Sequence, residues 1–292
     1  MNICAVIDIG SNSARMTVYD FTGEMPAEIQ NIRQYVRLSE NMQADNMLKA
    51  AAINRTVDAL VKMKEVANES GADSIYCVAT EAVRRAENAD MFLSAVKEKT
   101  GIDIKVLSGE REAEVGFKAV MREVTGDDTV IIDVGGGSAE FTLVIEKELV
   151  NSASLRLGAV VLTEQFKNKN HDEMYKFVYE KISQLEFLKS AKGVQVTALG
   201  GTASTITRVF GDRKINREKI DNLYMRLKSI PPEKRTEVAG IEPERADIIL
   251  AGVTVYKVLF DILESNMLYY SYSNIRDGIA YELFDRRWNN EL

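Results

Sequence analysis

Two short segments of the chain carry the same acidic and hydroxyl residues around a glycine-containing turn. They read VIDIGSNS at residues 6–13 and IIDVGGGS at residues 131–138. In each, an aspartate (Asp8 or Asp133) lies where an apolar strand meets the turn, and a second apolar strand follows. Mg²⁺ prefers carboxylate oxygens, and the backbone N–H groups of a glycine-rich turn can bind phosphate. One such hairpin is commonly only a β-turn, but two copies 125 residues apart (133 − 8) favour a shared chemical role.

Two glutamates are candidates for the same chemistry. Glu140 lies two residues after Ser138. Strand alternation therefore either points Glu140 into the site with Ser138 or leaves it as a solvent-facing strand residue. Glu112 belongs to a predicted helix in which Gly116 and Ala119 follow on the same line. These small residues indicate close packing or a cleft below Glu112, whereas the plain alternative is a first-turn acid that the helix dipole favours.

Two arginines, Arg84 and Arg85, follow a predicted strand at residues 74–79. A planar guanidinium can bind two phosphate oxygens at once, so either arginine is a candidate phosphate ligand. Adjacent arginines also commonly form no more than the solvated face of a helix. Their spacing by itself leaves both interpretations open.

Strands and helices alternate around both hairpins. Strand patterns outside the hairpins cover residues 28–38, 74–79, 103–107 and 194–199, and a Gly-Gly-Thr turn is predicted at 200–202. Helical periodicity covers residues 50–70, 89–99, 108–124, 172–188 and 243–263, and a further helix follows 274. This alternation predicts an α/β fold with helices on the faces of the sheets. The length of 292 residues and the repeat predict two domains, with a boundary near residues 121–127.

The composition argues against several classes of protein. The net charge is 37 − 44 = −7, so the chain as a whole repels polyanions and is not expected to wrap nucleic acid. A single histidine, His171, excludes zinc-protease motifs and histidine-rich metal phosphohydrolase sites. Cys4 and Cys77 lie in apolar strand patterns and are expected to be buried thiols. Neither a membrane-spanning run nor a signal peptide is evident, so we expect a cytoplasmic protein without membrane contact.

Seven segments, in the same order, resemble the Ppx/GppA family of exopolyphosphatases and guanosine pentaphosphate phosphatases. They are VIDIGSNSAR (6–15), TEAVRRA (80–86), SGEREA (108–113), IIDVGGGSAEF (131–141), LRLGAVVLTE (155–164), LGGTAST (199–205) and PERADIILAG (243–252). The chain resembles the short form of the family, without the C-terminal His–Asp-type region of its long members. The family lies in the superfamily of actin-like proteins, sugar kinases and Hsp70 ATPases.

The resemblance implies an architecture. Two ribonuclease H-like domains, residues 1–122 and 123–276, would each hold a mixed sheet flanked by helices, with the active site in the interdomain cleft. A C-terminal helix at about 277–292 would pack back on the first domain. The family also suggests a homodimer.

The resemblance assigns roles to the candidate residues as well. Glu112 resembles the catalytic base that activates water, and Arg84 resembles a clamp on the phosphate. Mg²⁺, or Mn²⁺ in its place, would be carried by Asp133 and Glu140, with Asp8 opposite. The phosphate-binding loops would be formed by Ser11, Asn12, Ser13, Gly135, Gly136, Gly137 and Ser138.

Three residues depart from the family pattern. Arg111 stands where members often carry a second glutamate, and a cation there would lower the pKa of Glu112 unless the arginine points away. Val161 occupies a position that is often basic; with the acidic net charge, this favours short polyphosphate or a nucleotide over very long chains. Asn274 replaces a usual glycine, and asparagine tolerates the positive φ that we expect there.

These residues favour a Mg²⁺-dependent exopolyphosphatase that releases terminal orthophosphate from inorganic polyphosphate. The alternative substrate is guanosine pentaphosphate, hydrolysed at its 5′ phosphates. Two hypotheses of other classes stay open: a small-molecule kinase of the same superfamily, and a nucleotide-binding regulator without turnover. Phosphate release without an acceptor separates the hydrolase from the kinase, and tight binding without turnover would indicate the regulator.

Overall fold

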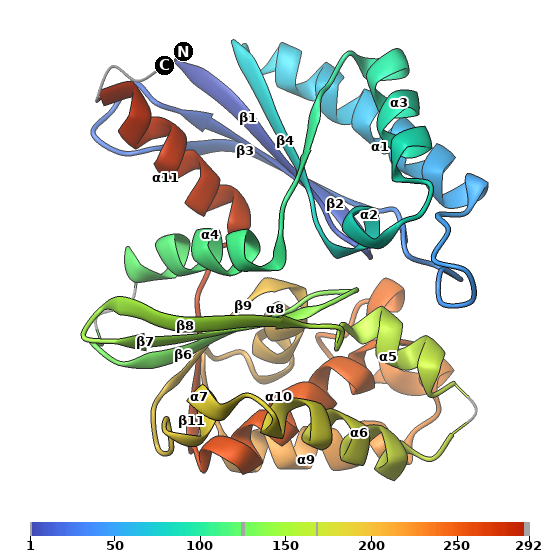
Figure 1. The fold of residues 1–292 in the computed structure, drawn as a ribbon, viewed down its shortest axis with the longest axis vertical. Coiled ribbons are helices and arrows are strands. Elements are labelled where there is room, and N and C mark those ends of the chain that lie inside the picture. Colours follow the sequence, from blue (N-terminus) through green and yellow to red (C-terminus); the bar gives the residue numbers. More distant parts are fainter. Residues whose placement is uncertain (1, 124–125, 168, 289–292) are drawn as a thin grey trace. The chain divides into compact units, whose positions relative to one another are not determined.

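The computed structural model describes residues 2–123, 126–167 and 169–288. Its contacts divide the chain into two units, residues 1–119 with 273–292 and residues 120–272. Each unit contains one mixed sheet with helices against it, so the predicted α/β fold class is confirmed (Figure 1). Among the residues described, no helix combines the length and the apolar character needed to cross a bilayer.

The first unit is built on a five-stranded sheet in the order β3-β2-β1-β4-β5. Its strands are β1 (Ile3–Ile9), β2 (Ser13–Asp20), β3 (Ala27–Tyr35), β4 (Ser74–Ala79) and β5 (Ile104–Val106). Its helices are α1 (Ala50–Glu69), α2 (Glu81–Arg85), α3 (Ala89–Thr100), α4 (Gly109–Met121) and α11 (Ile275–Trp288). β1 and β2 form the first predicted hairpin, and β4 runs parallel to β1 on its other side.

The alternation of side chains along β1 explains the layers of this unit. Ala5 and Ile7 are buried on the face where α1 and α3 pack. Cys4 and Val6 are buried on the opposite face, which α11 covers (Figure 1). The prediction of buried thiols is confirmed, and burial raises the pKa of both Cys4 and Cys77. Neither cysteine is therefore suited to act as a nucleophile.

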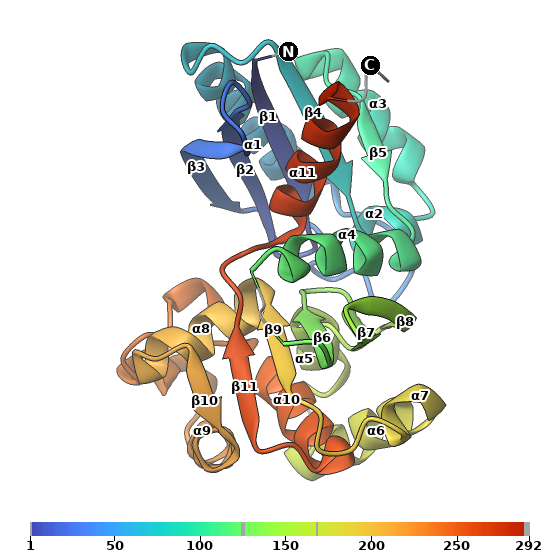
Figure 2. The same ribbon diagram turned by 90° about the vertical axis from the view of Figure 1, so that its left-hand side faces the viewer.

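The second unit is built on a six-stranded sheet in the order β10-β11-β9-β6-β7-β8. Its strands are β6 (Thr129–Val134), β7 (Ala139–Ile145), β8 (Glu148–Leu155), β9 (Val196–Leu199), β10 (Lys214–Asn216) and β11 (Met267–Tyr270). Its helices are α5 (Ala159–Gln165), α6 (His171–Ser183), α7 (Glu186–Lys189), α8 (Gly200–Phe210), α9 (Arg217–Ser229) and α10 (Ile249–Leu263), with 3₁₀ turns at Pro232–Glu237 and Pro243–Arg245. β6 and β7 form the second predicted hairpin, and Figure 2 shows β9, β11 and β10 side by side. The apolar helix α10 packs against α5, α6, α8 and α9 in the core.

Several predicted element boundaries differ from the structure. The helix predicted at 172–188 ends at Ser183 and resumes as α7, because Leu185 between them is extended. The turn predicted at 200–202 is the first turn of α8, which follows β9 directly. The helix predicted from Ser108 ends at Met121, and its predicted end at Val124 lies outside the described residues.

The helix predicted at 243–263 begins only at Ile249. The buried guanidinium of Arg235 donates to the carbonyls of Ala246 and Asp247 at 3.2 and 3.3 Å. A continuous helix would use those carbonyls for its own hydrogen bonds. Arg235, which lies outside the predicted helix, therefore competes with it for these two carbonyls.

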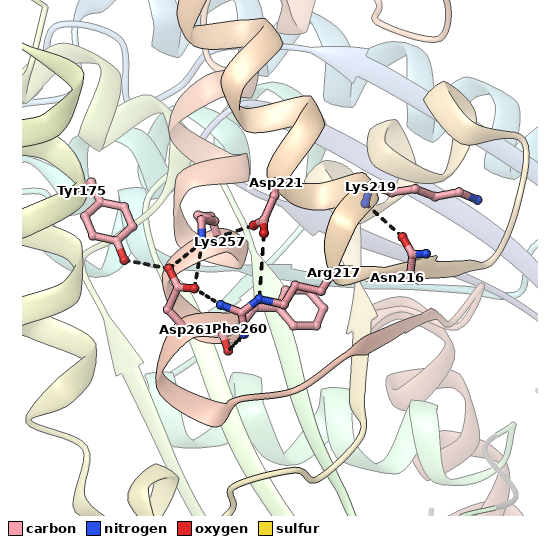
Figure 3. A network of polar contacts seen from close by, with 8 residues as sticks. All are labelled: Tyr175, Asn216, Arg217, Lys219, Asp221, Lys257, Phe260 and Asp261. Carbon is pink, nitrogen blue, oxygen red and sulfur yellow. Dashed lines mark hydrogen bonds and ion pairs between the residues drawn. The ribbon is translucent and has the colours of Figure 1, made fainter.

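A network of polar and charged side chains joins α6, α9 and α10 (Figure 3). Lys257 and Asp261 on α10 pair at 2.7 Å, and Lys257 also lies 3.2 Å from Asp221 on α9. Arg217 on α9 pairs with Asp261, and the hydroxyl of Tyr175 on α6 donates to Asp261 at 2.7 Å. The network ties three helices together, and it involves none of the residues assigned to the candidate site.

Candidate functional site

The two predicted hairpins end in the same backbone turn. The Gly10 N–H donates to the Ser13 carbonyl at 3.0 Å, and the Gly135 N–H donates to the Ser138 carbonyl at 3.0 Å. Each turn lies at the carboxyl end of a strand that also pairs in parallel with a neighbour, β1 with β4 and β6 with β9. The repeat seen in the sequence is therefore a repeat of backbone geometry as well.

The carbonyl groups of both turns are held by the segment that follows the third strand of each sheet. In the second unit, the carbonyls of residues 135–137 accept the N–H groups of residues 158–161 at 2.9 to 3.3 Å. In the first unit, the carbonyls of Ser11 and Asn12 accept the N–H groups of residues 36, 37 and 39 at 2.9 to 3.1 Å. In the described chain, no backbone carbonyl accepts the N–H groups of residues 136 and 137. With its carbonyls bound on one side, the glycine turn is suited to present these donors to an anion.

Two carboxylates face each other beside the second turn. Asp133 on β6 and Glu140 on β7 are direct cross-strand partners, so their side chains leave the same face of the sheet. Glu140 is only 4% exposed, which excludes the solvent-facing alternative, and it accepts the Ser154 hydroxyl at 2.7 Å. Gly200, with φ +84°, lies against Asp133: a Cβ there would be 2.0 Å from the carboxylate oxygen Oδ1. Only glycine leaves room for that carboxylate.

Asp8, the equivalent acid beside the first turn, has cationic neighbours instead. Its cross-strand partner is Arg15, and its Oδ2 lies 4.0 Å from Nη1 of Arg276. Burial raises the pKa of Asp8, while the charges of Arg276 and Arg15 oppose that shift. Within the described residues, Oδ1 of Asp8 and both polar side-chain atoms of Asn12 are buried without a hydrogen-bond partner. Such atoms are expected where a ligand completes the hydrogen bonding.

The Asp133–Glu140 pair fits Mg²⁺, the predicted cofactor. A hard cation takes one or two carboxylates from the protein and completes its shell with water and phosphate oxygens. The described part of the chain contains no cluster of three or more His, Cys, Asp or Glu suited to a metal ion. Two carboxylates on neighbouring strands match the number that such a cation takes from the protein.

Glu112 lies in a compact charged cluster of the first unit. It is 7% exposed, so it is not a solvated first-turn acid, and its N–H donates to the carbonyl of Ser108 at 2.9 Å. Its Oε2 accepts Nη1 of Arg84 at 3.2 Å. Arg84 also donates to the Leu107 carbonyl at 2.6 Å and to Glu81 at 2.7 Å. Burial alone would lower the pKa of Arg84, but the two carboxylates raise it above its ordinary value.

Arg84 is therefore bound by protein acceptors, whereas the resemblance implies a clamp on phosphate. Its side chain belongs to the half-buried α2 and does not form a solvated helix face. The contact with Glu112 shows that the two predicted site residues lie together. In this arrangement Arg84 can orient the Glu112 carboxylate.

Arg111, the departure beside Glu112, points away from it. Its guanidinium pairs with Glu114 at 2.7 Å and with Glu282 of α11. Lys118 contacts the same two glutamates, at 3.2 and 2.9 Å.

The two other departures have structural explanations. Val161 is buried, and its N–H belongs to the set that binds the second turn. Asn274 is not in the positive-φ conformation expected from the sequence, so that prediction is wrong. Its Oδ1 accepts the N–H of Arg276 at 3.0 Å, and its own N–H donates to Asp277 at 2.7 Å. Asparagine serves here as the cap of α11, a role that its side-chain oxygen suits.

Two features of the site were missed in the sequence. The segment 158–161 holds the turn carbonyls through backbone atoms, which leave no side-chain signal beyond the glycine at 158. Glu81 binds Arg84, and its spacing of three residues on a helix was a usable signal for an ion pair.

Comparisons with known proteins lead to one family. A bifunctional 3-dehydroquinate synthase/phosphatase from Fusobacterium nucleatum is 29% identical over an alignment that covers 95% of this chain and 46% of the relative. A guanosine-5'-triphosphate,3'-diphosphate pyrophosphatase from Vibrio vulnificus is 28% identical, over 99% of this chain and 60% of the relative. The chain thus spans about half to three fifths of the length of these relatives. The crystal structure of an exopolyphosphatase from Cytophaga hutchinsonii shares the fold, with a TM-score of 0.88 over 97% of this chain and 98% of that one at 21% identity.

A family profile also matches most of the chain. The profile of the Ppx/GppA phosphatase family matches residues 17–287. That range includes Arg84, Glu112, Asp133 and Glu140, while Asp8 precedes it. The chain therefore belongs to the Ppx/GppA phosphatase family.

Proposed function

We propose that this chain is an exopolyphosphatase that uses Mg²⁺ to release terminal orthophosphate from short inorganic polyphosphate, with Glu112 as the base that activates water. The observation that carries the proposal is the Asp133–Glu140 pair, two opposed carboxylates beside a turn whose N–H groups at 136 and 137 meet no backbone carbonyl in the described chain. Such a pair is suited to a hard cation, and such a turn to the phosphate oxygens that the cation also contacts.

The chain's own groups can carry out each part of the hydrolysis. The turn N–H groups bind and orient the terminal phosphate, so that positioning supplies most of the rate enhancement. As the water oxygen bonds to the terminal phosphorus, Glu112 accepts its proton, and the bond from phosphorus to the bridging oxygen breaks. The shortened polyphosphate leaves with the bridging oxygen. Asp133 and Glu140 would hold Mg²⁺, which would supply positive charge to the phosphate oxygens.

Guanosine pentaphosphate is the alternative substrate, and the comparisons support it equally. The Vibrio vulnificus relative is named for action on a guanosine nucleotide of this kind. Both substrates end in a phosphoanhydride, so the same groups can act on either. Val161 adds no positive charge and the net charge of −7 disfavours long polyanions, so short polyphosphate or a nucleotide is favoured over very long chains.

Orthophosphate release with Mg²⁺ tests the proposal. Wild type and Glu112→Gln are compared on short polyphosphate, long polyphosphate and guanosine pentaphosphate. We expect release from short polyphosphate and a loss of about 10²–10⁴-fold in the variant, the usual contribution of a positioned base. Release only from the nucleotide would select the alternative substrate. Near-normal turnover of Glu112→Gln would remove Glu112 as the base, and no release by wild type would favour the kinase or the silent regulator.

A further inference from the structure

Glu81 is a buried carboxylate that the proposed reaction does not use. It is 8% exposed and begins α2, three residues before Arg84. Its Oε2 accepts Nη2 of Arg84 at 2.7 Å, and its Oε1 lies 3.6 Å from Nε of Arg85. A carboxylate loses hydration when it is buried, and ion pairing must offset that cost. Its position is therefore best explained by what it does to its arginine partner.

The guanidinium of Arg84 is divided between two carboxylates. Nη2 binds Glu81, while Nη1 binds Glu112 at 3.2 Å and the Leu107 carbonyl at 2.6 Å. A guanidinium is planar and rigid, so fixing Nη2 also fixes the place of Nη1. Without Glu81, the same fork could turn and bind both oxygens of Glu112, as arginine commonly does with carboxylates.

We propose that Glu81 is a positioning residue: it holds one side of Arg84, so that the other side contacts Glu112, and it shares the charge of the arginine with Glu112. This inference rests on the proposed role of Glu112 as the base. A carboxylate that faces a whole, unshared arginine charge is a weaker base. Glu81 thus keeps Glu112 oriented and still able to take a proton from water.

The remaining charged groups of α2, α4 and α11 near this cluster make contacts of their own. Arg85 contacts Glu81 and the side chain of Asn46, and Arg111 and Lys118 each pair with Glu114 and Glu282. Glu110 is exposed; hydrogen bonds at its own backbone and from Ser108 lower its pKa, and the charge of Arg84 adds the smallest contribution. A substitution at Glu81 on α2 would therefore act on Glu112 through Arg84, which contacts both carboxylates.

Glu81→Gln separates charge from position, because glutamine keeps an oxygen that can accept from Arg84 but carries no charge. We expect the acidic limb of the kcat/KM profile to move down by about one pH unit, the usual size of a neighbouring-charge effect. We also expect kcat to fall several-fold with little change in KM, since no substrate contact is lost. Glu81→Asp, which restores the charge, should recover most of the wild-type profile.

Glu114→Gln is the matched control, since Glu114 also pairs with an arginine three residues away on a helix, at 2.7 Å. It should leave the pH profile of wild type unchanged. If Glu81→Gln gives a wild-type profile, or changes only KM or thermal stability, the inference is overturned. If wild type and Glu112→Gln behave as proposed, such a result would overturn the role of Glu81 and leave the proposed role of Glu112 intact.

A substrate-free measurement keeps the test independent of the proposed activity. A ¹³C NMR titration of the Glu112 carboxyl compares its pKa in wild type and in Glu81→Gln. Removing a like charge and leaving Arg84 unshared both favour the ionised form, so the pKa of Glu112 should fall in the variant. Equal pKa values in the two proteins would overturn the inference even if wild type proved inactive on every phosphate substrate.

Discussion

The two repeated hairpins share a turn but differ in charge. In both, a glycine N–H closes the turn at 3.0 Å and an aspartate is the next-to-last residue of the first strand. The residue directly opposite that aspartate is Arg15 in the first hairpin and Glu140 in the second. The first site is thus Asp8 among arginines, and the second is a pair of acids, Asp133 and Glu140. The same backbone turn therefore occurs with two different charge distributions. Of the two cross-strand pairs, the one in the second hairpin carries the negative charge that a cation needs.

Glu140→Gln tests this difference with the largest expected effect. The change removes one charge of the acidic pair and keeps the size of the side chain. We expect the Mg²⁺ concentration needed for half-maximal orthophosphate release to rise at least about 100-fold, since even residues that only support a metal ligand are worth 10- to 100-fold. The measurement is phosphate release across a Mg²⁺ titration.

Arg15→Gln is the matched control in the first hairpin, at the equivalent place. It should leave the Mg²⁺ titration midpoint where it is in wild type, whatever its effect on substrate affinity. A similar shift of the midpoint in both variants would show that the two hairpins do not divide the work as their charges indicate.

Gly158→Ala tests the close packing of the segment 158–161 against the second turn. A Cβ at Gly158 would lie 2.3 Å from backbone atoms of Gly136 and Gly137. Backbone cannot move aside as a flexible side chain can, so we expect a loss of about 1–3 kcal/mol in the free energy of unfolding, as for overpacking. Urea denaturation measures it. Gly126→Ala is the control, because a Cβ at Gly126 has nothing within 4 Å; equal losses in the two variants would contradict the argument.

Much of the hairpin design could be predicted from the sequence because it depends on local patterns. A repeated aspartate, turn and strand predicted both hairpins, and strand alternation allowed Glu140 to share a face with Ser138. These features depend on residues within about ten positions of one another. The division into strands and helices follows from hydrophobic periodicity for the same reason.

Apart from the local Glu81–Arg84 pair, the charged cluster around Glu112 could not be predicted in this way, because its other members meet only through the tertiary fold. Arg84 is bound by Glu81, Leu107 and Glu112, which come from three segments. The direction of Arg111 depends on Glu282, 171 residues away. A sequence pattern gives the types of such residues, but it does not show which arginine pairs with which carboxylate.

Asp8→Asn gives the smallest expected effect and tests the first hairpin alone. Burial raises the folded-state pKa of Asp8 above its ordinary value of 3.8, and Arg276 and Arg15 offset this only in part. The native state therefore holds the proton more tightly than the unfolded state, so this group loses stability as the pH rises from below 3.8 through its folded-state pKa. Asparagine has no such cost. In urea denaturation from pH 3 to pH 8, the free energy of unfolding of the variant should rise relative to that of wild type as the pH increases. The difference should become constant and modest near neutrality.

The sign of this pH dependence distinguishes a strained functional acid from an ordinary ion pair. Asp45 has a lowered pKa, because Lys49 and the N–H of Met47 donate to its carboxylate. Asp45→Asn should therefore show the opposite trend: its free energy of unfolding should fall relative to that of wild type as the pH rises through the acidic range. If Asp8→Asn followed the same trend as Asp45→Asn, the arginines would outweigh burial at Asp8. The first hairpin would then be a structural ion pair and not a site held ready for a ligand.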